Sequence, residues 1–397
     1  PFTPQWPACL DRKRPIMDQV TTGGDVLLSY PYESMDPFVQ LLREASRDPH
    51  VISIKITLYR LASQSHLAEA LIDAAENGKE VTALFELRAR FDESNNIEWS
   101  QRFEQAGCNV IYGFRDYKVH SKICCFPRQT DDGIQHITQL GTGNYNEKTA
   151  ALYTDFSLLT ADRTIAADGV AFFQNMLIGD LQGSYGKLLV APVSLKQTLL
   201  RLIDGEIARG DRGRIILKTN AVTERELIDK LAEASQAGVR VDLIVRGICC
   251  LVPGVPGKTE HITVTSIVGE FLEHSRIYCF GEGALRQMYL SSADIMTRNQ
   301  ERRVEIACPI WDKEIQGQLQ TILDTQLRDN AKASFLQPSG AYLRKEPQNG
   351  QPRLDCQEAF LETSLHHPEP AAPVKKPRPE TEKVSFLQKM RRLFGGK

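Results

Sequence analysis

The sequence repeats one arrangement of segments in two halves, and this internal repeat restricts the chain to a duplicated fold. In each half, an apolar run typical of a buried strand precedes a helical pattern and a second apolar run. The segments are 51–58, 67–77 and 81–87 in the first half, and 214–218, 224–237 and 239–245 in the second. A shift of 160 positions places Gly78 on Gly238, each just after a predicted helix, where glycine commonly ends it. We therefore expect an α/β fold built from two similar domains.

Each half also carries a histidine that is followed two residues later by a cation. His120 lies in Val-His-Ser-Lys with Lys122, and His274 lies 154 positions later in Glu-His-Ser-Arg with Arg276. Residues two apart on a strand point to the same face, so each cation would lie beside its imidazole. Imidazole is a good nucleophile at neutral pH, and the cation can neutralise a phosphoryl oxygen. Two such histidines facing one another predict covalent phosphoryl transfer.

A small polar loop follows the histidine strand in both halves. The strand predicted at 134–140 leads into Gly-Thr-Gly-Asn-Tyr-Asn, which contains Asn144, and the strand at 288–290 leads into Ser-Ser-Ala-Asp, which ends at Asp294. Polar residues also end the first strand of each half. Ligands of parallel α/β sheets gather where the strands end. The sequence therefore predicts ligand-binding groups at this end of both halves.

Composition limits the class of protein. The chain has 397 residues, 42% of them hydrophobic, which is enough for two packed domains. The formal net charge of -2 gives no global basic field, so we expect no nucleic-acid partner, and a polyanion would need a local cluster of cations. Nine cysteines without Cys-x-x-Cys spacing indicate buried thiols in a reducing cytoplasm. No signal peptide or membrane-spanning run is apparent in the sequence.

The predicted domains leave a segment at each end of the chain. Residues 1–20 read as a lead-in from a missing upstream domain, 21–190 as the first catalytic domain and 191–345 as the second. Residues 346–397 read as a disordered linker with a basic amphipathic tail. The tail predicts docking or peripheral membrane contact, and a solvated basic tail is the alternative, which its shortness favours.

The paired motifs resemble those of the phospholipase D superfamily. The matching positions are His120, Lys122 and Asn144 in the first half and His274, Arg276 and Asp294 in the second. The resemblance implies two tandem phospholipase D-like domains, with mixed sheets flanked by helices and a pseudo-twofold active site between them. One histidine would attack phosphorus, and the other would handle the proton of the leaving group.

Longer segments resemble bacterial polyphosphate kinase of the first type. They include Gly-Thr-Gly-Asn-Tyr-Asn at 141–146, Ile-Val-Arg-Gly-Ile-Cys-Cys-Leu at 244–251 and Phe-Leu-Glu-His-Ser-Arg-Ile at 271–277. The resemblance spans roughly residues 20–345 and covers the two carboxy-terminal catalytic domains of that enzyme. It implies reversible transfer of the terminal phosphoryl group of ATP to inorganic polyphosphate, with Mg²⁺ as cofactor and a homo-oligomer as the full-length assembly.

The same resemblance implies a role for individual residues. His120 would be the phosphohistidine nucleophile and His274 its acid–base or stabilising partner, while Tyr153 and Arg246 would contact ATP. Arg60 and Arg90 match a magnesium–phosphate site; because arginine has no lone pair for a metal, we expect both to clamp phosphate beside Mg²⁺. The remaining histidines are expected to be structural: His50, His66, His136, His261, His366 and His367.

Two departures and two alternative functions remain. Glu270 stands where the family pattern has arginine, and Ile295 where it has tryptophan, both beside the second half-site. The first alternative is a phospholipase D-like phosphodiesterase, which would need neither ATP nor Mg²⁺. Arg60, Arg90 and Arg246 disfavour it, because they suit a ligand with several phosphates in a row. A non-catalytic fragment that binds polyanions is the second alternative.

Overall fold

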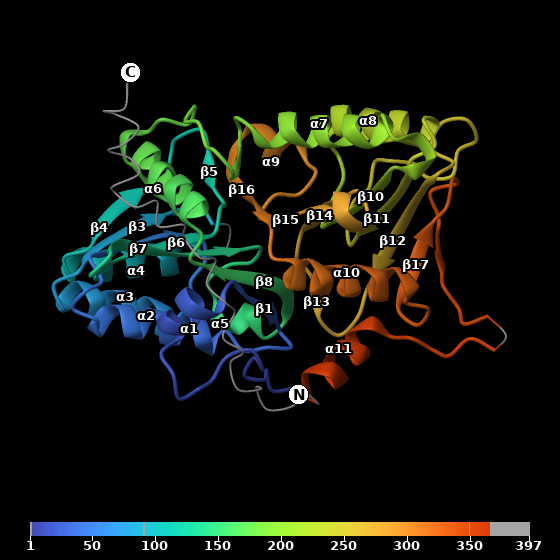
Figure 1. Ribbon diagram of the computed structural model, residues 1–397. Helices are drawn as coiled ribbons and strands as arrows, with labels where there is room; N and C mark the ends of the chain where they lie inside the picture. Colours follow the sequence, from blue (N-terminus) through green and yellow to red (C-terminus); the bar gives the residue numbers. More distant parts are fainter. Residues whose placement is uncertain (1, 90–91, 349, 366–397) are drawn as a thin grey trace, which may run out of the picture.

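The two halves of the sequence form two mixed sheets with helices on their outer faces (Figure 1). The computed structural model describes residues 2–89, 92–348 and 350–365. The predicted fold class, two tandem α/β domains with mixed sheets flanked by helices, is confirmed. The predicted strands and helices of both halves are present, and their ends differ from the predicted ends by a few residues.

The first sheet has the order β1-β8-β7-β6-β2-β3-β4. Within this row the pairs β2–β3 and β3–β4 are parallel, and the other pairs are antiparallel. The strands are β1 (Val26–Tyr30), β2 (Ser53–Leu58), β3 (Glu80–Phe85), β4 (Asn109–Tyr112), β6 (Ile123–Thr130), β7 (Gly133–Gly141) and β8 (Tyr153–Thr160). The helices of this half are α1 (Ile16–Gly23), α2 (Asp36–Arg47), α3 (His66–Glu76), α4 (Glu93–Gln105), α5 (Glu147–Ala150) and α6 (Arg163–Ile178).

The second sheet has the order β18-β17-β12-β11-β10-β14-β15-β16, with β9 pairing β16. Its strands are β9 (Leu189–Ala191), β10 (Arg214–Thr219), β11 (Arg240–Val245), β12 (Ile262–Ile267), β14 (Ile277–Phe280), β15 (Gln287–Ser291), β16 (Arg303–Ile310), β17 (Ala333–Leu336) and β18 (Tyr342–Arg344). Its helices are α7 (Leu195–Ile207), η1 (Gly210–Arg212), α8 (Arg225–Gln236), η2 (Gly283–Leu285), α9 (Thr297–Glu301) and α10 (Lys313–Arg328).

Three hydrophobic clusters hold these layers together. One packs α1, α2 and α3 against the first sheet, and another packs α7 and α8 against the second. The central cluster draws on both halves: Phe172 of α6 and Leu319 of α10 share it with Leu158 and Ile306 from the two sheets. Because burial of apolar area is the main driving force of folding, this shared core joins the halves into one body.

The two sheets also exchange short strands next to the histidines. Strand β5 (Lys118–Val119) precedes His120 but pairs in parallel with β16 of the second sheet. Strand β13 (Leu272–Glu273) precedes His274 but pairs in parallel with β8 of the first sheet. Each histidine is therefore bound through its own segment to the sheet of the opposite half.

The repeated glycines end equivalent helices, as predicted. Gly78 follows α3 with φ 84°, and Gly238 follows α8 with φ 89°, a backbone conformation that glycine adopts without strain. The amide of Lys79 donates to the carbonyl of Ala74 at 3.0 Å, and the amide of Val239 makes the equivalent bond to Ala234 at 3.0 Å. These bonds satisfy helix carbonyls that would otherwise lack a partner.

The segment after residue 345 is more ordered than predicted. Helix α11 (Cys356–Leu365) packs against the second histidine strand, so the prediction of a disordered linker is wrong for these residues. The Gln357 side chain accepts a hydrogen bond from the amide of Phe271 at 3.0 Å and donates to its carbonyl at 2.9 Å and to Glu273 at 2.7 Å. The low-complexity composition begins only beyond this helix, and the predicted amphipathic tail lies outside the described residues.

The predicted lead-in is likewise part of the fold. Helix α1 begins within it, and Ile16, Met17 and Val20 are buried in the first core cluster. The lead-in prediction is therefore wrong for these residues, because residues 1–20 show no strong hydrophobic period although several of them are buried.

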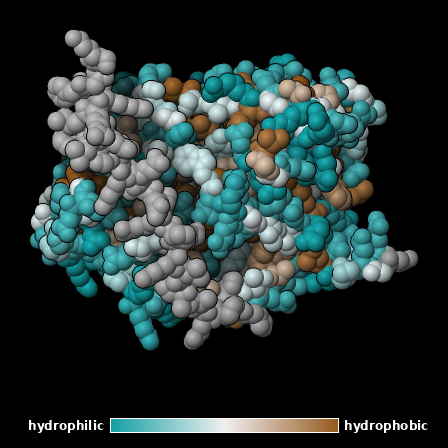
Figure 2. All heavy atoms as spheres, viewed as in Figure 1, coloured by the Kyte–Doolittle hydropathy of each residue, from teal (hydrophilic) through white to brown (hydrophobic). Residues whose placement is uncertain are grey.

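Hydrophobic residues are scattered over the face shown in Figure 2 and do not gather in one broad patch. Isolated apolar side chains of this kind are normal on protein surfaces. Within the described ranges, no helix combines the length and the apolar character needed to cross a bilayer.

If α11 is an integral part of the fold, Gln357→Ala should lower the free energy of unfolding by about 2–3 kcal/mol, because it removes the hydrogen bond to Oε1 of Glu273 and both bonds to the buried backbone of Phe271. Gln351→Ala is the matched control, since this glutamine is exposed in the same segment and should change stability by less than about 0.5 kcal/mol. Urea unfolding of both variants measures the difference. Equal values would contradict an integral role for α11.

Candidate active site

The first histidine is oriented by a carboxylate from the second sheet. His120 follows β5, is only 7% exposed, and its Nδ1 lies 3.0 Å from Oε2 of Glu305 on β16. The backbone amide of His120 also donates to the carbonyl of Val304 at 2.9 Å. With Nδ1 bonded to the carboxylate, Nε2 is the nitrogen left to face a ligand.

The second histidine has the reciprocal arrangement. His274 follows β13, and its Nδ1 lies 2.7 Å from Oδ2 of Asp155 on β8, in the first sheet. Its backbone amide donates to the Thr154 hydroxyl at 3.2 Å. Each histidine therefore belongs to one half of the molecule, and the carboxylate that orients it belongs to the other.

The residues behind these pairs repeat at a spacing of 150 positions. The Thr142 hydroxyl donates to Oδ1 of Asp155 at 2.6 Å, and the Ser292 hydroxyl donates to Glu305. Asparagine 144 and aspartate 294 keep the same spacing. In the first half, a Cβ on Gly143 would lie 2.1 Å from the Asp155 carboxylate, so this position of the loop requires glycine.

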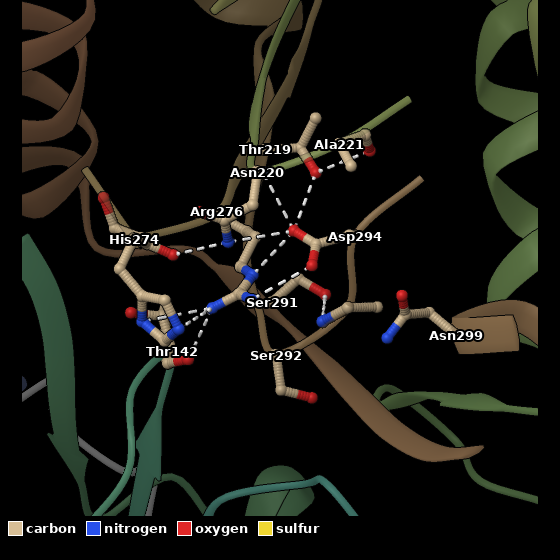
Figure 3. A network of polar contacts seen from close by, with 12 residues as sticks. Thr142, Thr219, Asn220, Ala221, His274, Arg276, Ser291, Ser292, Asp294 and Asn299 are labelled. Carbon is tan, nitrogen blue, oxygen red and sulfur yellow. Dashed lines mark hydrogen bonds and ion pairs between the residues drawn. The ribbon is translucent and has the colours of Figure 1, made fainter. Parts of the chain in front are cut away.

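Arg276 connects the second histidine to the polar loop of its own half. It forms a bidentate ion pair with Asp294, from Nε to Oδ1 at 3.0 Å and from Nη2 to Oδ2 at 3.1 Å (Figure 3). Its Nη1 donates to the carbonyl of Thr142 at 3.2 Å and lies 3.3 Å from Nε2 of His274. Figure 3 shows these groups converging from both sheets. A bidentate pair fixes the guanidinium plane firmly beside the imidazole.

Asn220 extends this network from the end of β10. Its side-chain nitrogen lies 3.0 Å from Oδ1 of Asp294 and donates to the carbonyl of His274 at 3.1 Å. Its oxygen accepts from Nε of Arg246 at 3.0 Å. The strand end that the sequence marked as polar therefore joins Arg246 to the second histidine.

Tyr59 lies at the centre of the first half-site. Its ring is edge-on to His120 with 4.8 Å between ring centroids. The Lys122 ammonium lies 5.5 Å from this ring, and the Arg60 guanidinium 5.7 Å from it. Lys122 also donates to the carbonyl of His120. Arg60 forms an ion pair with Asp92 at 3.0 Å, and this pair fixes the Arg60 side chain beside the site.

Burial and positive charge lower the pKa values of His120 and Lys122 in the first half-site. Burial, followed by the charges of Lys122, Arg303 and Arg276, lowers the pKa of His120 well below its usual value. Burial also lowers the pKa of Lys122 to about 7, against the attraction of Glu305. A neutral imidazole keeps the lone pair that a nucleophile needs.

The second half-site has a different balance of charge. Burial lowers the pKa of His274, but the nearby Asp155 opposes this effect. Burial favours the neutral acid of Asp155, yet His274 and Arg276 hold its pKa below the usual value. Burial instead raises the pKa of Glu305 at the first half-site. The ionised Asp155 therefore offsets part of the effect of burial on His274, and His274 can take up a proton more readily than His120.

Most of the predicted site residues meet around this centre. His120, Lys122, Tyr153, His274 and Arg276 contact one another or share partners, and the Tyr153 ring lies 5.5 Å from that of His274. The other predicted site residues lie further out. Arg60 flanks the first half-site and Arg246 the second. Asn144 has a buried oxygen without a hydrogen-bond partner among the described residues, and Arg90 lies outside them.

Sequence reasoning missed the residues that orient the histidines. Neither Asp155 nor Glu305 was singled out from the sequence. Searching for the repeat at 150 positions, which Asn144 and Asp294 already display, would have paired Asp155 with Glu305. Of the two departures from the family pattern, Ile295 is buried behind Asp294 and Glu270 is exposed.

The carboxylates around the histidines are already engaged, which bears on how a magnesium ion would bind. Asp155 and Glu305 hold the histidines, and Asp294 holds Arg276. Magnesium prefers oxygen ligands and keeps several waters. These engaged carboxylates therefore do not form a closed protein cage for the ion, and they fit an ion that would take most of its ligands from elsewhere.

The lowered pKa of His120 predicts a loss of stability in acid. An unfolded histidine titrates near pH 6.5, whereas the folded His120 takes up its proton only at lower pH, so acidification below pH 6.5 favours the unfolded chain. Between pH 7.5 and 5.5 this costs up to about 1.4 kcal/mol, which His120→Gln should remove. Urea unfolding at both pH values measures it.

His66→Gln serves as the control for this prediction, because His66 is 67% exposed on α3. This variant should keep the pH dependence of the unsubstituted protein. If His120→Gln keeps it as well, His120 is not the group responsible.

Two family models match consecutive parts of the chain. Polyphosphate kinase C-terminal domain 1 matches residues 15–181, and polyphosphate kinase C-terminal domain 2 matches residues 188–357. The change from one model to the next lies close to the boundary predicted after residue 190. The second model extends into α11, which the predicted second domain left out.

Similar proteins carry the same name over most of this chain. It is 44% identical to a polyphosphate kinase of Staphylococcus epidermidis over 93% of this chain and 50% of that protein. It is 45% identical to a polyphosphate kinase of Pseudomonas aeruginosa over 91% of this chain and 53% of that protein. The chain thus spans about half the length of these curated relatives.

Solved structures give the same result. The crystal structure of polyphosphate kinase from Porphyromonas gingivalis matches with a TM-score of 0.83 and 38% identity, over 91% of this chain and 55% of that one. A phosphatidylserine synthase from Haemophilus influenzae matches with a TM-score of 0.56 but 13% identity, over 85% of this chain and 91% of that one, which shows a shared fold alone. The resemblance found in the sequence is confirmed, and the chain belongs to the polyphosphate kinase family, with the regions of its C-terminal domains 1 and 2.

Proposed function

We propose that these two domains transfer the terminal phosphoryl group of ATP reversibly to inorganic polyphosphate, through a phosphohistidine at His120. The observation that carries the proposal is the crossed pairing of His120 with Glu305 and of His274 with Asp155, inside a site rich in buried cations. A covalent carrier needs a neutral, oriented nucleophile, and a transferred phosphoryl group needs positive charge around it.

In the first step, Nε2 of His120 attacks the γ-phosphorus of ATP. Its Nδ1 donates its hydrogen to Glu305, so the lone pair of Nε2 is free. The N–P bond forms while the bond from the γ-phosphorus to the bridging oxygen breaks, and ADP leaves with the electron pair. Lys122 and Arg276 lie beside the histidines, where their charges can stabilise the equatorial oxygens.

In the second step, a terminal oxygen of polyphosphate attacks the phosphohistidine. A new P–O bond forms, the N–P bond breaks, and His120 regains its lone pair. The chain is then longer by one phosphate. The same groups act in reverse when ADP takes a phosphoryl group from polyphosphate.

His274 acts as the partner at the phosphates rather than as the carrier. The pKa of Asp155 is held below its usual value, and the resulting carboxylate opposes the burial that lowers the pKa of His274. A protonated imidazole can donate to the leaving oxygen, or stabilise its charge, and then accept the proton back. This difference from Glu305 supports His120, not His274, as the nucleophile.

The surrounding residues supply contacts to the nucleotide and its phosphates. We assign Tyr153, Arg246 and Asn144 to ATP and its phosphates, and Arg60 and Arg90 to the phosphates that carry Mg²⁺. Bound Mg²⁺ would add charge neutralisation at the β- and γ-phosphates. The buried, unpartnered oxygen of Asn144 supports a ligand at this position.

Other properties of the complete protein are also proposals. We expect a cytoplasmic homo-oligomer, with peripheral membrane contact through the tail as a further proposal. A phospholipase D-like phosphodiesterase stays the alternative function, since the paired histidine motifs resemble those of that superfamily. A fragment that binds polyanions without catalysis is the second alternative function.

The central test is labelling with γ-labelled ATP in the full-length protein that contains these residues. We expect an acid-labile label that His120→Ala abolishes and that added polyphosphate or ADP discharges. His136→Ala is the control, since His136 lies half-buried on β7 away from this network, and should label normally. Label that survives His120→Ala would remove His120 as the carrier. Hydrolysis of a phosphodiester without labelling would favour the alternative function.

Removal of the carboxylate that orients His120 should slow its phosphorylation. Glu305→Gln keeps the shape of the side chain but no longer fixes the tautomer, so we expect the rate of labelling to fall roughly 100-fold or more. Glu301→Gln, at a half-exposed position on α9, should label at the normal rate. Rapid-quench measurement of both rates decides, and an unchanged Glu305→Gln rate would contradict the orienting role.

A further inference from the structure

A groove on the second domain continues outward from the catalytic centre. It has a volume of about 740 Å³, and its lining includes residues of β12, β17 and β18 at the edge of the second sheet. Its lining includes Arg246, Ser266, Lys332, Ser334, Tyr342 and Arg344. No part of the proposed chemistry uses the last five of these residues.

Arg246 connects this groove to the second histidine. Its Nε donates to the oxygen of Asn220 at 3.0 Å, and the nitrogen of Asn220 donates to the carbonyl of His274 at 3.1 Å. The inner end of the groove is therefore two hydrogen bonds from the catalytic centre.

The strand register orders the outer residues into a row. Ser266 of β12 lies directly opposite Ser334 of β17, which lies directly opposite Arg344 of β18. Directly opposed residues share a face of the sheet, and strands are roughly 4.8 Å apart, so Arg344 lies roughly 10 Å from Ser266. With Arg246 adjoining Ser266 and Lys332 preceding β17, the cations extend along a distance of several consecutive phosphates.

The charges of this groove are uncompensated. Its lining holds three cations and no carboxylate. Neither Arg246, Lys332 nor Arg344 forms an ion pair with any residue that the structure describes. A second groove, at the opposite end of the same sheet, differs: it also contains Glu282 and Asp324, and its arginines at 214 and 240 both contact Asp242. The first groove therefore presents positive charge without a carboxylate in its lining, and it adjoins the catalytic centre.

We propose that the groove over β12, β17 and β18 binds the polyphosphate chain beyond the phosphate that reacts, with Lys332 and Arg344 as its outer contacts. This inference rests on the proposed function. Polyphosphate carries negative charge along its whole length, so each cation of the row meets a phosphate. A nucleoside carries no charge beyond its own phosphates and would leave Lys332 and Arg344 unmatched, although Tyr342 offers it an aromatic surface.

The test measures ATP formation from ADP and polyphosphate by the full-length protein, with long-chain polyphosphate and with tetrapolyphosphate. In the double variant Lys332→Ala/Arg344→Ala, we expect KM for the long chain to rise roughly tenfold, from the loss of two charge contacts near the surface. The slope of log KM against log salt concentration should also fall by about 2, one for each cation removed. KM for tetrapolyphosphate and for ADP should stay within twofold, because these ligands end before the outer cations.

Two further variants separate charge from structure. Arg344→Lys keeps the charge but changes the hydrogen bond from Arg344 to the carbonyl of Ala331, and it should keep the KM for the long chain. Arg212→Ala/Arg225→Ala removes two exposed cations of the same domain outside the groove, and should leave every KM unchanged.

Each result distinguishes the proposals. A higher KM for ADP with unchanged KM for long chains would assign the groove to the nucleotide and overturn the inference. An unchanged KM in the double variant would overturn it as well, and so would a rise of KM in Arg344→Lys equal to that in the double variant. If the unsubstituted protein forms no ATP from polyphosphate, the proposed function itself fails, whatever the groove binds.

Discussion

The arrangement of the whole molecule depends on the crossed pairing between histidine and carboxylate. His120 needs Glu305 and His274 needs Asp155, and in both pairs the carboxylate comes from the opposite sheet. The short strands β5 and β13 place each histidine against the foreign sheet at the required register. The shared core under α6 and α10 keeps the two sheets at a fixed distance. Without this alignment, both imidazoles would lie in buried, cationic surroundings with no group to orient them.

The site also illustrates how buried charges are balanced. Lysine 122 and arginine 276 lie almost fully inside the protein, where an isolated charge is costly. Asp294 satisfies the guanidinium with two hydrogen bonds, whereas the lysine has a backbone carbonyl and a pKa of about 7. The two half-sites thus hold, at similar positions, a lysine with a lowered pKa and an arginine with a raised one, and the proposed division of roles between the two histidines rests on this asymmetry.

Local patterns in the sequence predicted the elements and the two histidines, but not their relations across the molecule. The glycines that end α3 and α8 and the cations two residues from each histidine follow from short-range geometry, and the structure places them as expected. Glu305 could not be found in this way, because its role depends on pairing between sheets that lie far apart in sequence. Helix α11 was missed for a similar reason: its stability comes from the contacts of Gln357 with β13 and not from a strong pattern of its own.

The exchange of strands has a consequence for how a duplicated protein of this kind can diverge. Equivalent positions are separated by 160 residues at the helix-ending glycines, 154 at the histidines and 150 at the carboxylates, so the halves have gained or lost residues between these points. Such changes are tolerated in connecting segments but not in β5, β8, β13 or β16, because a shift of one residue there would turn a carboxylate away from the histidine of the other half. Neither half can change independently in these strands, because each supplies the carboxylate that orients the histidine of the other half.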